Sequence, residues 1–373
     1  MQELIFIGVL GGALAALYVW AFRTLPGARW QFAAAVPVAA LPDGGWRGLN
    51  LTWYGVFYAL GIAVSSALGF VLLKSIGAPT LPVLLLLVGT VAVCMPAARF
   101  LAGIIERKKG TQSVAAGFFT GMVLVPPALL LMNALVDSVN LPPLATLAAF
   151  GAAYALGEGI GRLSCISFGC CYGRRVVDLG AGLRRLVAPF AVRFRGPTKK
   201  IAYASGWEGV AVVPIQAVTA TLYTAVALGA AWLFLAGEYG AALLLSIGFT
   251  QVWRVASEFL RADYRGGRKF TVYQWMSLSG VAYVAAWVAV LPREADMVRA
   301  DIAQGLAALW TAPGVIAVQA LWLAAFLYAG RSTVTGSTLR FHVVDEHRKS
   351  FAAQPPRSAP RRKAPKAKAL AGA

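Results

Sequence analysis

Charged residues lie inside otherwise apolar stretches of this sequence, where ionisable side chains are costly and usually face a cavity or a partner. Glu158 and Arg162 share the stretch LGEGIGRL at an i,i+4 spacing, so they lie on one helix face and could pair. The stretch QVWRVASEFLRADYR carries Arg254, Glu258 and Arg261 at helical spacing. Two arginines with one carboxylate leave a positive charge over, and a guanidinium can hold a phosphate through two parallel hydrogen bonds. The sequence therefore predicts an anion site; the alternatives are a self-neutralising ion pair and arginines that reach the headgroups.

Three of the four cysteines, Cys165, Cys170 and Cys171, follow in the stretch GRLSCISFGCCYGR, and Cys94 stands alone in another apolar stretch. The Cys-x4-Cys-Cys spacing has no matching second half, which argues against a zinc site. A disulfide from Cys165 to either of the other two fits a turn, and flanking arginines could instead activate a thiol as a nucleophile. We expect packing at a helix end as the main role, and neither a metal nor a cofactor.

The elements that must position these residues are membrane-spanning helices. The chain has 373 residues, 59% hydrophobic and 13% charged, whereas a soluble domain keeps about 25% charged residues. The first apolar stretch carries Glu3 in place of a basic n-region, so we expect an uncleaved span rather than a signal peptide. A helix crosses the hydrocarbon core with about 20 apolar residues. We therefore predict an all-α, polytopic integral membrane protein with about nine spans, near 3–22, 53–73, 80–98, 113–136, 143–162, 212–236, 239–260, 273–292 and 304–329.

Two polar segments lie outside these spans. Residues 174–211 are basic with apolar patches and are long enough for a small extramembrane cap, whereas residues 331–373 have the Pro/Ala/Lys composition of a disordered basic tail. The formal net charge of +19 lies between and after apolar runs, which indicates anionic lipid and not nucleic acid as the partner. The only histidines, His342 and His347, are in the tail, which argues against a histidine-ligated metal in the membrane.

The stretch from Gly161 to Arg174 resembles the signature G-R-x-G-N-F-x-N-x-E-x-x-G-R of the prolipoprotein diacylglyceryl transferase family, with the same length between its Gly-Arg ends. Other segments match family motifs in the same order over about residues 50–290. Trp53-Tyr54-Gly55 is similar to W-Y-G, VPIQAV to H-P-x-Q-L-Y-E, and RVASEFLRAD to R-x-x-x-E-x-x-R-x-x-D. Arg99 lies where the family has an arginine in G-G-R-x-G-Y.

The resemblance implies a fold of about seven core transmembrane helices, to which this chain adds one span at each end. It divides the chain into 1–50 (added span and linker), 51–292 (transferase-like membrane domain with the cap at 174–211 between spans five and six), 293–330 (added span) and 331–373 (tail).

The activity implied by the resemblance is transfer of a diacylglyceryl group from phosphatidylglycerol to the thiol of a lipobox cysteine in prolipoproteins, at the bacterial inner (plasma) membrane. Arg162 falls on the arginine that holds the donor phosphate in the family, and Arg254 on its second essential arginine; both would be catalytic. The residues that would bind substrate are Tyr54, Arg99, Gly161, Gly169, Gln216, Glu258 and Arg261. The expected partners are phosphatidylglycerol or another anionic phospholipid and the lipobox peptide.

The chain departs from the family at residues that handle protons and hydrogen bonds. Ala115 stands where the family has a histidine in S-F-H-G-G-L-I-G. Cys165 and Phe168 replace the two signature asparagines, and Cys170 replaces the signature acid. The phosphate-binding arginines are thus retained, while the family's natural base is not.

Without that histidine, the base for the acceptor thiol would be Glu258, Glu158 or a phenol such as Tyr54. Two other functions stay open: a transferase of the same fold with another acceptor, and a catalytically silent protein that binds or transports phospholipid. The charge bias places the N-terminus outside, whereas the family orientation with one helix added places it in the cytoplasm. We favour the family orientation, since basic residues around a phosphate site have a reason of their own.

Overall fold

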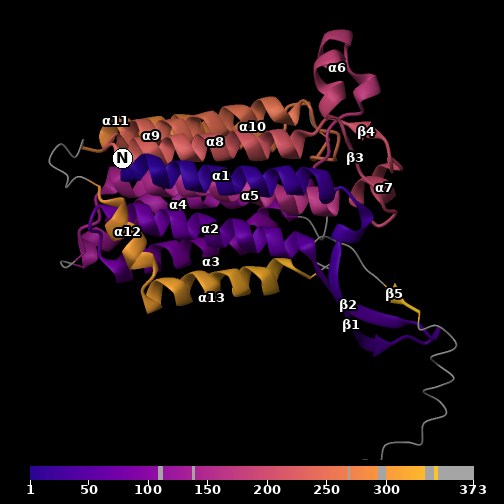
Figure 1. Ribbon diagram of the computed structural model, residues 1–373, viewed down its shortest axis with the longest axis horizontal. Coiled ribbons are helices and arrows are strands. Elements are labelled where there is room, and N and C mark those ends of the chain that lie inside the picture. Colours follow the sequence, from indigo (N-terminus) through magenta and orange to yellow (C-terminus); the bar gives the residue numbers. More distant parts are fainter. Residues whose placement is uncertain (108–111, 137–138, 268, 293–299, 332–339, 343–373) are drawn as a thin grey trace, which may run out of the picture. The chain divides into compact units, whose positions relative to one another are not determined.

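The computed structural model describes residues 1–107, 112–136, 139–267, 269–292, 300–331 and 340–342. These residues fall into two compact units, one made of residues 1–35 and the described part of 50–331, the other of residues 36–49 and 340–342. The first unit is a bundle of long helices lying side by side (Figure 1). Seven of its helices are long and apolar enough to cross a membrane: α1 (Gln2–Thr24), α2 (Trp53–Ser75), α3 (Thr80–Glu106), α4 (Val114–Leu135), α5 (Pro143–Phe168), α8 (Ile215–Leu235) and α13 (Ala312–Ala329). The predicted fold class, an all-α polytopic membrane protein, is confirmed.

The span predicted at 239–260 is one continuous helical segment with an irregular middle. It begins as α9 (Tyr239–Leu243), continues through a π-helical stretch, Leu244–Phe249, and ends as α10 (Thr250–Glu258). A π-helical stretch shifts the helical register, and such stretches are frequent at functional sites. Here it precedes Arg254 and so sets the face on which that side chain lies. The helix α11 (Val272–Val290) forms the span predicted at 273–292.

The last predicted span, 304–329, is wrong as a single helix. The chain forms α12 (Ile302–Leu309) and then α13, with a break at Trp310 and Thr311 (Figure 1). Pro313 is the second residue of α13, and proline has no amide hydrogen to continue the ladder from the preceding turn. The break also brings Gly314 so close that a Cβ there would lie 2.6 Å from the carbonyl oxygen of Leu309.

The helix α5 occupies the centre of the bundle, packed against α2 and α8, and most of its length is buried. Glycines let the neighbours approach. A Cβ on Gly61 of α2 would lie 2.8 Å from the carbonyl oxygen of Gly157, and one on Gly159 would lie 2.7 Å from Oγ1 of Thr224 on α8. Small residues at such contacts allow membrane helices to pack backbone to backbone. The site residues on α5 are therefore held by two close-packed neighbours.

The C-terminal end of α5 extends past the predicted position and is tied to neighbouring segments. The helix ends at Gly169, which adopts the left-handed conformation (φ +71°) that glycine tolerates best. Lys199 is completely buried beside this end. Its ammonium donates to the carbonyl oxygen of Leu25 at 3.0 Å and to that of Ser167, which joins the ends of α1 and α5. Burial lowers the pKa of Lys199 to about 7.

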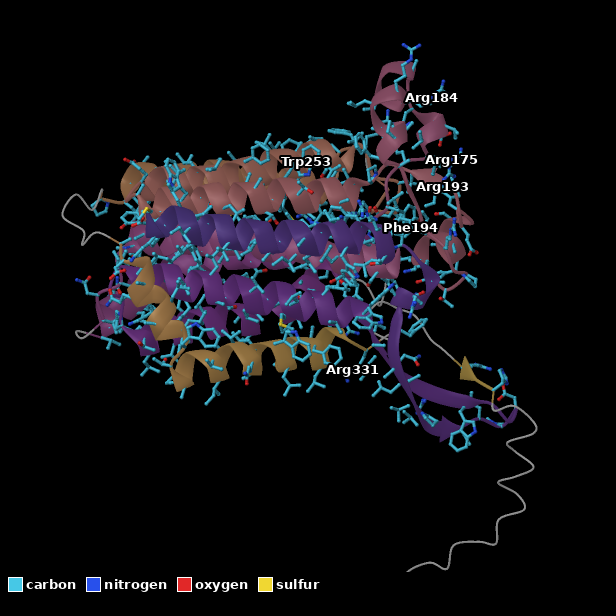
Figure 2. All side chains as sticks on the ribbon, in the orientation of Figure 1. Arg175, Arg184, Arg193, Phe194, Trp253 and Arg331 are labelled. Atoms are coloured by element: carbon cyan, nitrogen blue, oxygen red, sulfur yellow. The ribbon has the colours of Figure 1, made fainter. Side chains whose placement is uncertain are left out.

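The predicted cap lies at this same end of the bundle, where Figure 2 places Arg175, Arg184 and Arg193. Its two-stranded antiparallel sheet pairs Val192 with Val212. Its elements are the 3-10 turns Val176–Asp178 and Ala188–Phe190, the helices α6 (Ala181–Val187) and α7 (Lys200–Ser205), and the strands β3 (Val192–Arg193) and β4 (Ala211–Val212).

The second unit contains strands that the sequence analysis did not predict. A three-stranded sheet has the order β1 (Phe32–Ala40), β2 (Trp46–Thr52), β5 (Arg340–Phe341), with β2 and β5 antiparallel and Trp46 opposite Phe341. Arg340 also donates to Asp43 at 3.0 Å. Residues 340–341, which the sequence analysis placed in a disordered tail, thus form a short strand, and residues 343–373, including His347, lie outside the described part of the chain.

Candidate functional site

Arg162 and Arg254 come from different helices and meet at one carboxylate. Arg162 lies one turn after Glu158 on α5, and its guanidinium donates to Oε1 of Glu158. Nη1 of Arg254, on α10, donates to the same oxygen at 2.7 Å. The side chain of Arg162 is 9% exposed, that of Arg254 4% and that of Glu158 1%. Two positive charges against one negative charge leave the cluster cationic in a buried environment, where an anion is the natural further partner.

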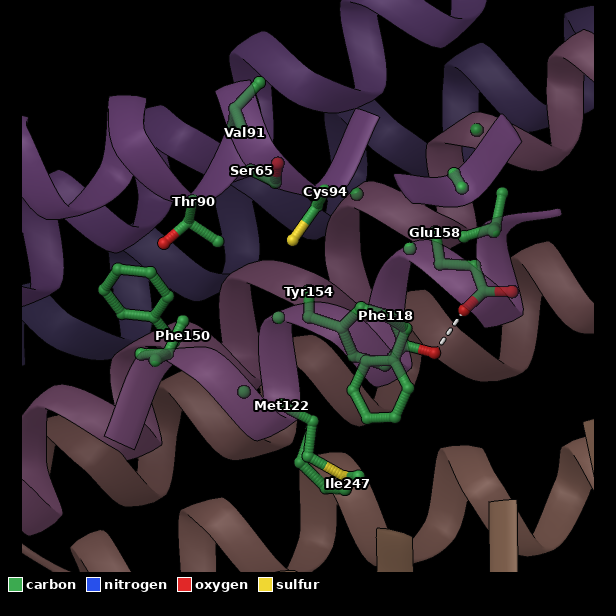
Figure 3. Close-up of a pocket in the computed structure, with 18 of the residues that line it drawn as sticks. Ser65, Thr90, Val91, Cys94, Phe118, Met122, Phe150, Tyr154, Glu158 and Ile247 are labelled. Atoms are coloured by element: carbon green, nitrogen blue, oxygen red, sulfur yellow. Dashed lines mark hydrogen bonds between the residues drawn. The ribbon is translucent and has the colours of Figure 1, made fainter. Parts of the chain in front are cut away.

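Hydrogen-bond donors in this cluster remain unused. The Nε atoms of Arg162 and Arg254 are buried and have no hydrogen-bond partner among the described residues. Both oxygens of Glu158, in contrast, are engaged: the hydroxyl of Tyr154 donates to Oε2, and Tyr154 in turn accepts from Gln251 at 3.0 Å (Figure 3). Glu158 therefore positions the two guanidiniums, and the spare donors are suited to a bound anion.

The trio of Arg254, Glu258 and Arg261 predicted from spacing is divided between two groups. Oε1 of Glu258 lies 3.2 Å from a guanidinium nitrogen of Arg265 and 3.6 Å from one of Arg261, while Arg254 turns to α5. Arg261 makes two hydrogen bonds of 2.8 Å to Asp263. Burial lowers the pKa of Arg261, but the negative charges of Asp263, the Cys171 thiolate and Glu258 outweigh it and raise the pKa above its usual value.

Two charged residues of this group were missed by the sequence analysis. Arg265 contacts Glu258 and lies 3.6 Å from Glu106 at the end of α3. The sequence did contain an indication of this role, because Arg265 follows Arg261 by four residues. Glu106 is the last residue of α3, which extends beyond the span predicted at 80–98, and it accepts a hydrogen bond from Tyr273 at 3.0 Å. The charged group is thus larger than the motifs indicated.

The three clustered cysteines meet at the end of α5. Their sulfur atoms all lie within 4.8 Å of one another, and all three thiols are free. Cys165 is in the last helical turn, and Gly169 reverses the chain so that Cys170 and Cys171 fold back toward it. Hydrogen bonds from the other two thiols, followed by the charges of Arg261 and Arg265, outweigh burial and lower the pKa of Cys171. Spacing alone did not predict this donor set.

Two cavities and one narrow crevice border Arg162. The apolar cavity, of about 250 Å³, is lined by residues of α2, α3, α4, α5, α9, α11 and the π-helical stretch (Figure 3). Its lining includes Glu158 and Arg162. The polar cavity, of about 420 Å³, is lined among others by Arg162, Arg254, Arg265 and the three cysteines. Tyr54 and Cys165 border both cavities. An apolar chamber thus meets a cationic one at the arginine pair.

The structure brings most of the predicted site residues to these cavities. Gln216 lines the crevice beside Arg254 and donates to the carbonyl oxygen of Cys170 at 2.9 Å. Gly161 lines the apolar cavity, with no atom within 4 Å of the position of a Cβ. Gly169 forms the C-cap of α5 and borders neither of the two cavities nor the crevice. Arg99 is exposed on α3 and borders none of these three cavities.

The position of the missing family histidine also lies near the charged group. Ala115, at the start of α4, is buried and packs in a small cluster with Ala116 and Tyr273. Its neighbour Val114 lines both cavities. Since alanine has no titratable group, this end of α4 supplies apolar contact where the family motif supplies a base.

The family model described as prolipoprotein diacylglyceryl transferase matches residues 46–290. The chain belongs to this family. The match runs from β2 through α11 and contains the arginine pair and the cysteine cluster. It also contains the helices α2 to α5, which line the apolar cavity. A comparison with curated proteins gave no match.

Membership of the diacylglyceryl transferase family confirms the resemblance that the motifs indicated, and it makes the chain a multi-pass membrane protein of a transferase family that acts on lipid and prolipoprotein. The helices α1, α12 and α13 lie outside the matched residues. They pack against the bundle, α1 against α8 and both α12 and α13 against α2. At the closest approach, a Cβ on Gly55 in the W-Y-G motif of α2 would lie 2.1 Å from Cα of Gly330, just after α13. The transferase core is therefore built with these added helices against it.

Proposed function

We propose that the protein transfers a diacylglyceryl group from phosphatidylglycerol to the thiol of a lipobox cysteine in prolipoproteins, at the inner membrane of a bacterium. The observation that carries the proposal is the pair of buried guanidiniums, Arg162 and Arg254, held by Glu158 at the junction of an apolar and a polar cavity. A phospholipid has the matching division into acyl chains and an anionic headgroup.

The apolar cavity supports a place for the lipid's hydrocarbon. Its walls carry aromatic and aliphatic side chains such as Phe118, Phe150 and Met122 (Figure 3), and burying them against acyl chains removes apolar surface from water. Gly161 keeps the wall next to Arg162 open, because any larger residue would project into the cavity. A lipid seated there would bring its phosphate to the arginine pair.

The arginine pair supplies what the bond-breaking step requires. As the bond between the glyceryl carbon and the phosphate oxygen breaks, negative charge grows on the departing glycerol phosphate. Two fixed guanidiniums in a site with little water stabilise that charge without reorganisation, and the loss of one such contact costs on the order of 10² in rate. The unpaired Nε donors of Arg162 and Arg254 give the pair spare capacity for the phosphate oxygens.

The acceptor thiol must lose its proton before or during attack, because the thiolate is the nucleophile. The predicted bases Glu158 and Glu258 both accept hydrogen bonds from guanidiniums, so each carboxylate already belongs to an ion pair. Tyr54 lines both cavities, but a phenol keeps its proton at neutral pH and so is a poor acceptor for the proton of the thiol. The protein's means of activating the thiol therefore has to come from another group.

Complementation of a strain depleted of its own diacylglyceryl transferase tests the proposal. Wild type should restore growth, Arg162→Ala and Arg254→Ala should not, and the exposed Arg99→Ala serves as matched control. Failure of a normally expressed wild type would remove the proposal. The replacement of the family histidine by Ala115 favours one alternative, a protein that binds phospholipid without turnover. Arg254-dependent binding of phosphatidylglycerol without any transfer would establish that alternative.

A further inference from the structure

The cysteine cluster is a preformed set of sulfur donors. The sulfur atoms of Cys165, Cys170 and Cys171 lie within 4.8 Å of one another, and a small adjustment of their side chains would bring them to the separation of about 3.8 Å that ligands at about 2.3 Å from one tetrahedral ion adopt. Cys165 and Cys170 are buried, and Cys171 is partly exposed to the polar cavity. Three donors from a seven-residue stretch need no movement of a second domain to converge.

The backbone of this stretch is fixed in a conformation that favours convergence. The N–H of Cys170 donates to the carbonyl oxygen of Cys165 at 3.1 Å, and Gln216 donates to the carbonyl oxygen of Cys170 at 2.9 Å. Cys171 has φ +55°, a left-handed conformation that is unfavourable for a residue with a Cβ. Strain of this kind persists only where the surroundings enforce it, and it clusters at functional sites. Packing alone would not require it.

The surrounding charges suit a thiolate-metal group. Three thiolates carry three negative charges, and a divalent ion would leave one in excess. Arg162, Arg254 and Arg265 line the same cavity and offset that charge. Sulfur donors select thiophilic ions such as Zn²⁺ and Cd²⁺ over Mg²⁺ or Ca²⁺. Three protein ligands with one open position is also the arrangement of catalytic, as opposed to structural, zinc sites.

We propose that Cys165, Cys170 and Cys171 bind a thiophilic divalent metal ion, with a fourth coordination position open to the polar cavity. A further role rests on the proposed function: the acceptor cysteine takes the fourth position as a thiolate. Its proton passes to water in the cavity, because a metal-bound thiol is deprotonated. The sulfur then attacks the glyceryl carbon, the bond from that carbon to the phosphate oxygen breaks, and its electron pair leaves with glycerol phosphate. The site thereby replaces the missing histidine.

The test measures metal binding without lipid or acceptor. Full-length protein in detergent, reduced and stripped with a chelator, is titrated with Cd²⁺, and the sulfur-to-cadmium charge-transfer absorbance is followed. Wild type should bind one Cd²⁺ per chain, and Zn²⁺ should displace it. Loss of a mere second-shell partner lowers metal affinity 10- to 100-fold, so Cys171→Ser should weaken binding at least about 100-fold. Cys94→Ser, which changes an isolated thiol on α3, is the matched control and should bind as wild type does.

Thermal unfolding and gel filtration of each variant establish that it folds. A wild type without a stoichiometric charge-transfer band, or a folded Cys171→Ser that binds Cd²⁺ as tightly as wild type, would overturn the metal site. The complementation assay separates this outcome from failure of the proposed function. If Cys171→Ser complements the strain, the metal has no catalytic role, and the proposed transferase function stands. If wild type binds Cd²⁺ but does not complement the strain, the metal site stands, and its proposed role in transfer is removed.

Discussion

Arg254 on α10 donates at 2.7 Å to Oε1 of Glu158, the same oxygen that Arg162 contacts. Arg254 and Glu158 are 96 residues apart in the chain. The shared carboxylate offsets the repulsion between two buried guanidiniums, and both arginines line the polar cavity. The arginine pair is thus organised before any ligand arrives, which is the condition for electrostatic stabilisation of a leaving phosphate.

Replacing the shared carboxylate should destabilise the protein in a way that an anionic lipid reverses. Glu158→Gln keeps the side chain's shape but leaves two buried guanidiniums without a counter-charge, and breaking a buried ion pair in this way costs about 3 kcal/mol or more. The melting temperature in neutral detergent should fall. Added phosphatidylglycerol should raise it by more than it raises that of wild type; an equal or smaller rise would argue against a phosphate at this site.

Lysine should not substitute for either arginine. Arg162→Lys and Arg254→Lys keep the charge but lose the planar fork that holds two oxygens at once. We expect the transfer rate to fall on the order of 10²-fold in each variant. The exposed Arg99→Lys gives the baseline for a change that touches no cavity. Wild-type rates in both buried variants would show that only net charge matters there.

The glycines of α2 and α5 should separate packing from function. A Cβ on Gly61 would lie 2.8 Å from a backbone oxygen of α5, whereas one on Gly161 meets no atom within 4 Å and projects into the apolar cavity. Gly61→Ala should therefore lower stability by about 1–3 kcal/mol through overpacking. Gly161→Ala should melt like wild type and yet lose transfer activity. Equal melting temperatures for both variants would contradict the close approach of α2 and α5.

Stability should rise with pH above neutrality because of Lys199. Burial lowers its pKa to about 7 in the folded chain, against about 10.4 in an unfolded one. Between these values the unfolded chain binds more protons, so alkaline pH favours the folded state. Melting temperatures at pH 7 and pH 9 should differ in that direction for wild type, and the difference should shrink in Lys199→Met. An unchanged slope in that variant would assign the effect to another group.

The sequence predicted the contacts of the site that form within a single helix. Helical spacing was enough to pair Glu158 with Arg162, and the order of motifs was enough for the fold. The contact of Arg254 with Glu158 was not predictable from spacing, because it depends on how α10 packs near α5 after the π-helical stretch.

Other features depended on the path of the backbone. The meeting of three thiols required the left-handed turn at Gly169, which a linear Cys-x4-Cys-Cys pattern does not reveal. The break between α12 and α13 was hidden by continuous apolarity, and the pairing of β5 with β2 joins segments almost 300 residues apart. Periodicity reports burial along one element and cannot report which distant element covers it.

Purified protein gives the most direct test that Arg162 and Arg254 hold the phosphate of a lipid donor during transfer. Wild type and Arg254→Ala are incubated with phosphatidylglycerol vesicles and a lipobox peptide, and the mass of the peptide is measured by mass spectrometry. We predict that wild type adds one diacylglyceryl group to the peptide cysteine and that folded Arg254→Ala adds it at least about 100-fold more slowly. A folded wild type that leaves the peptide unchanged, or an Arg254→Ala that modifies it at the wild-type rate, would contradict this role.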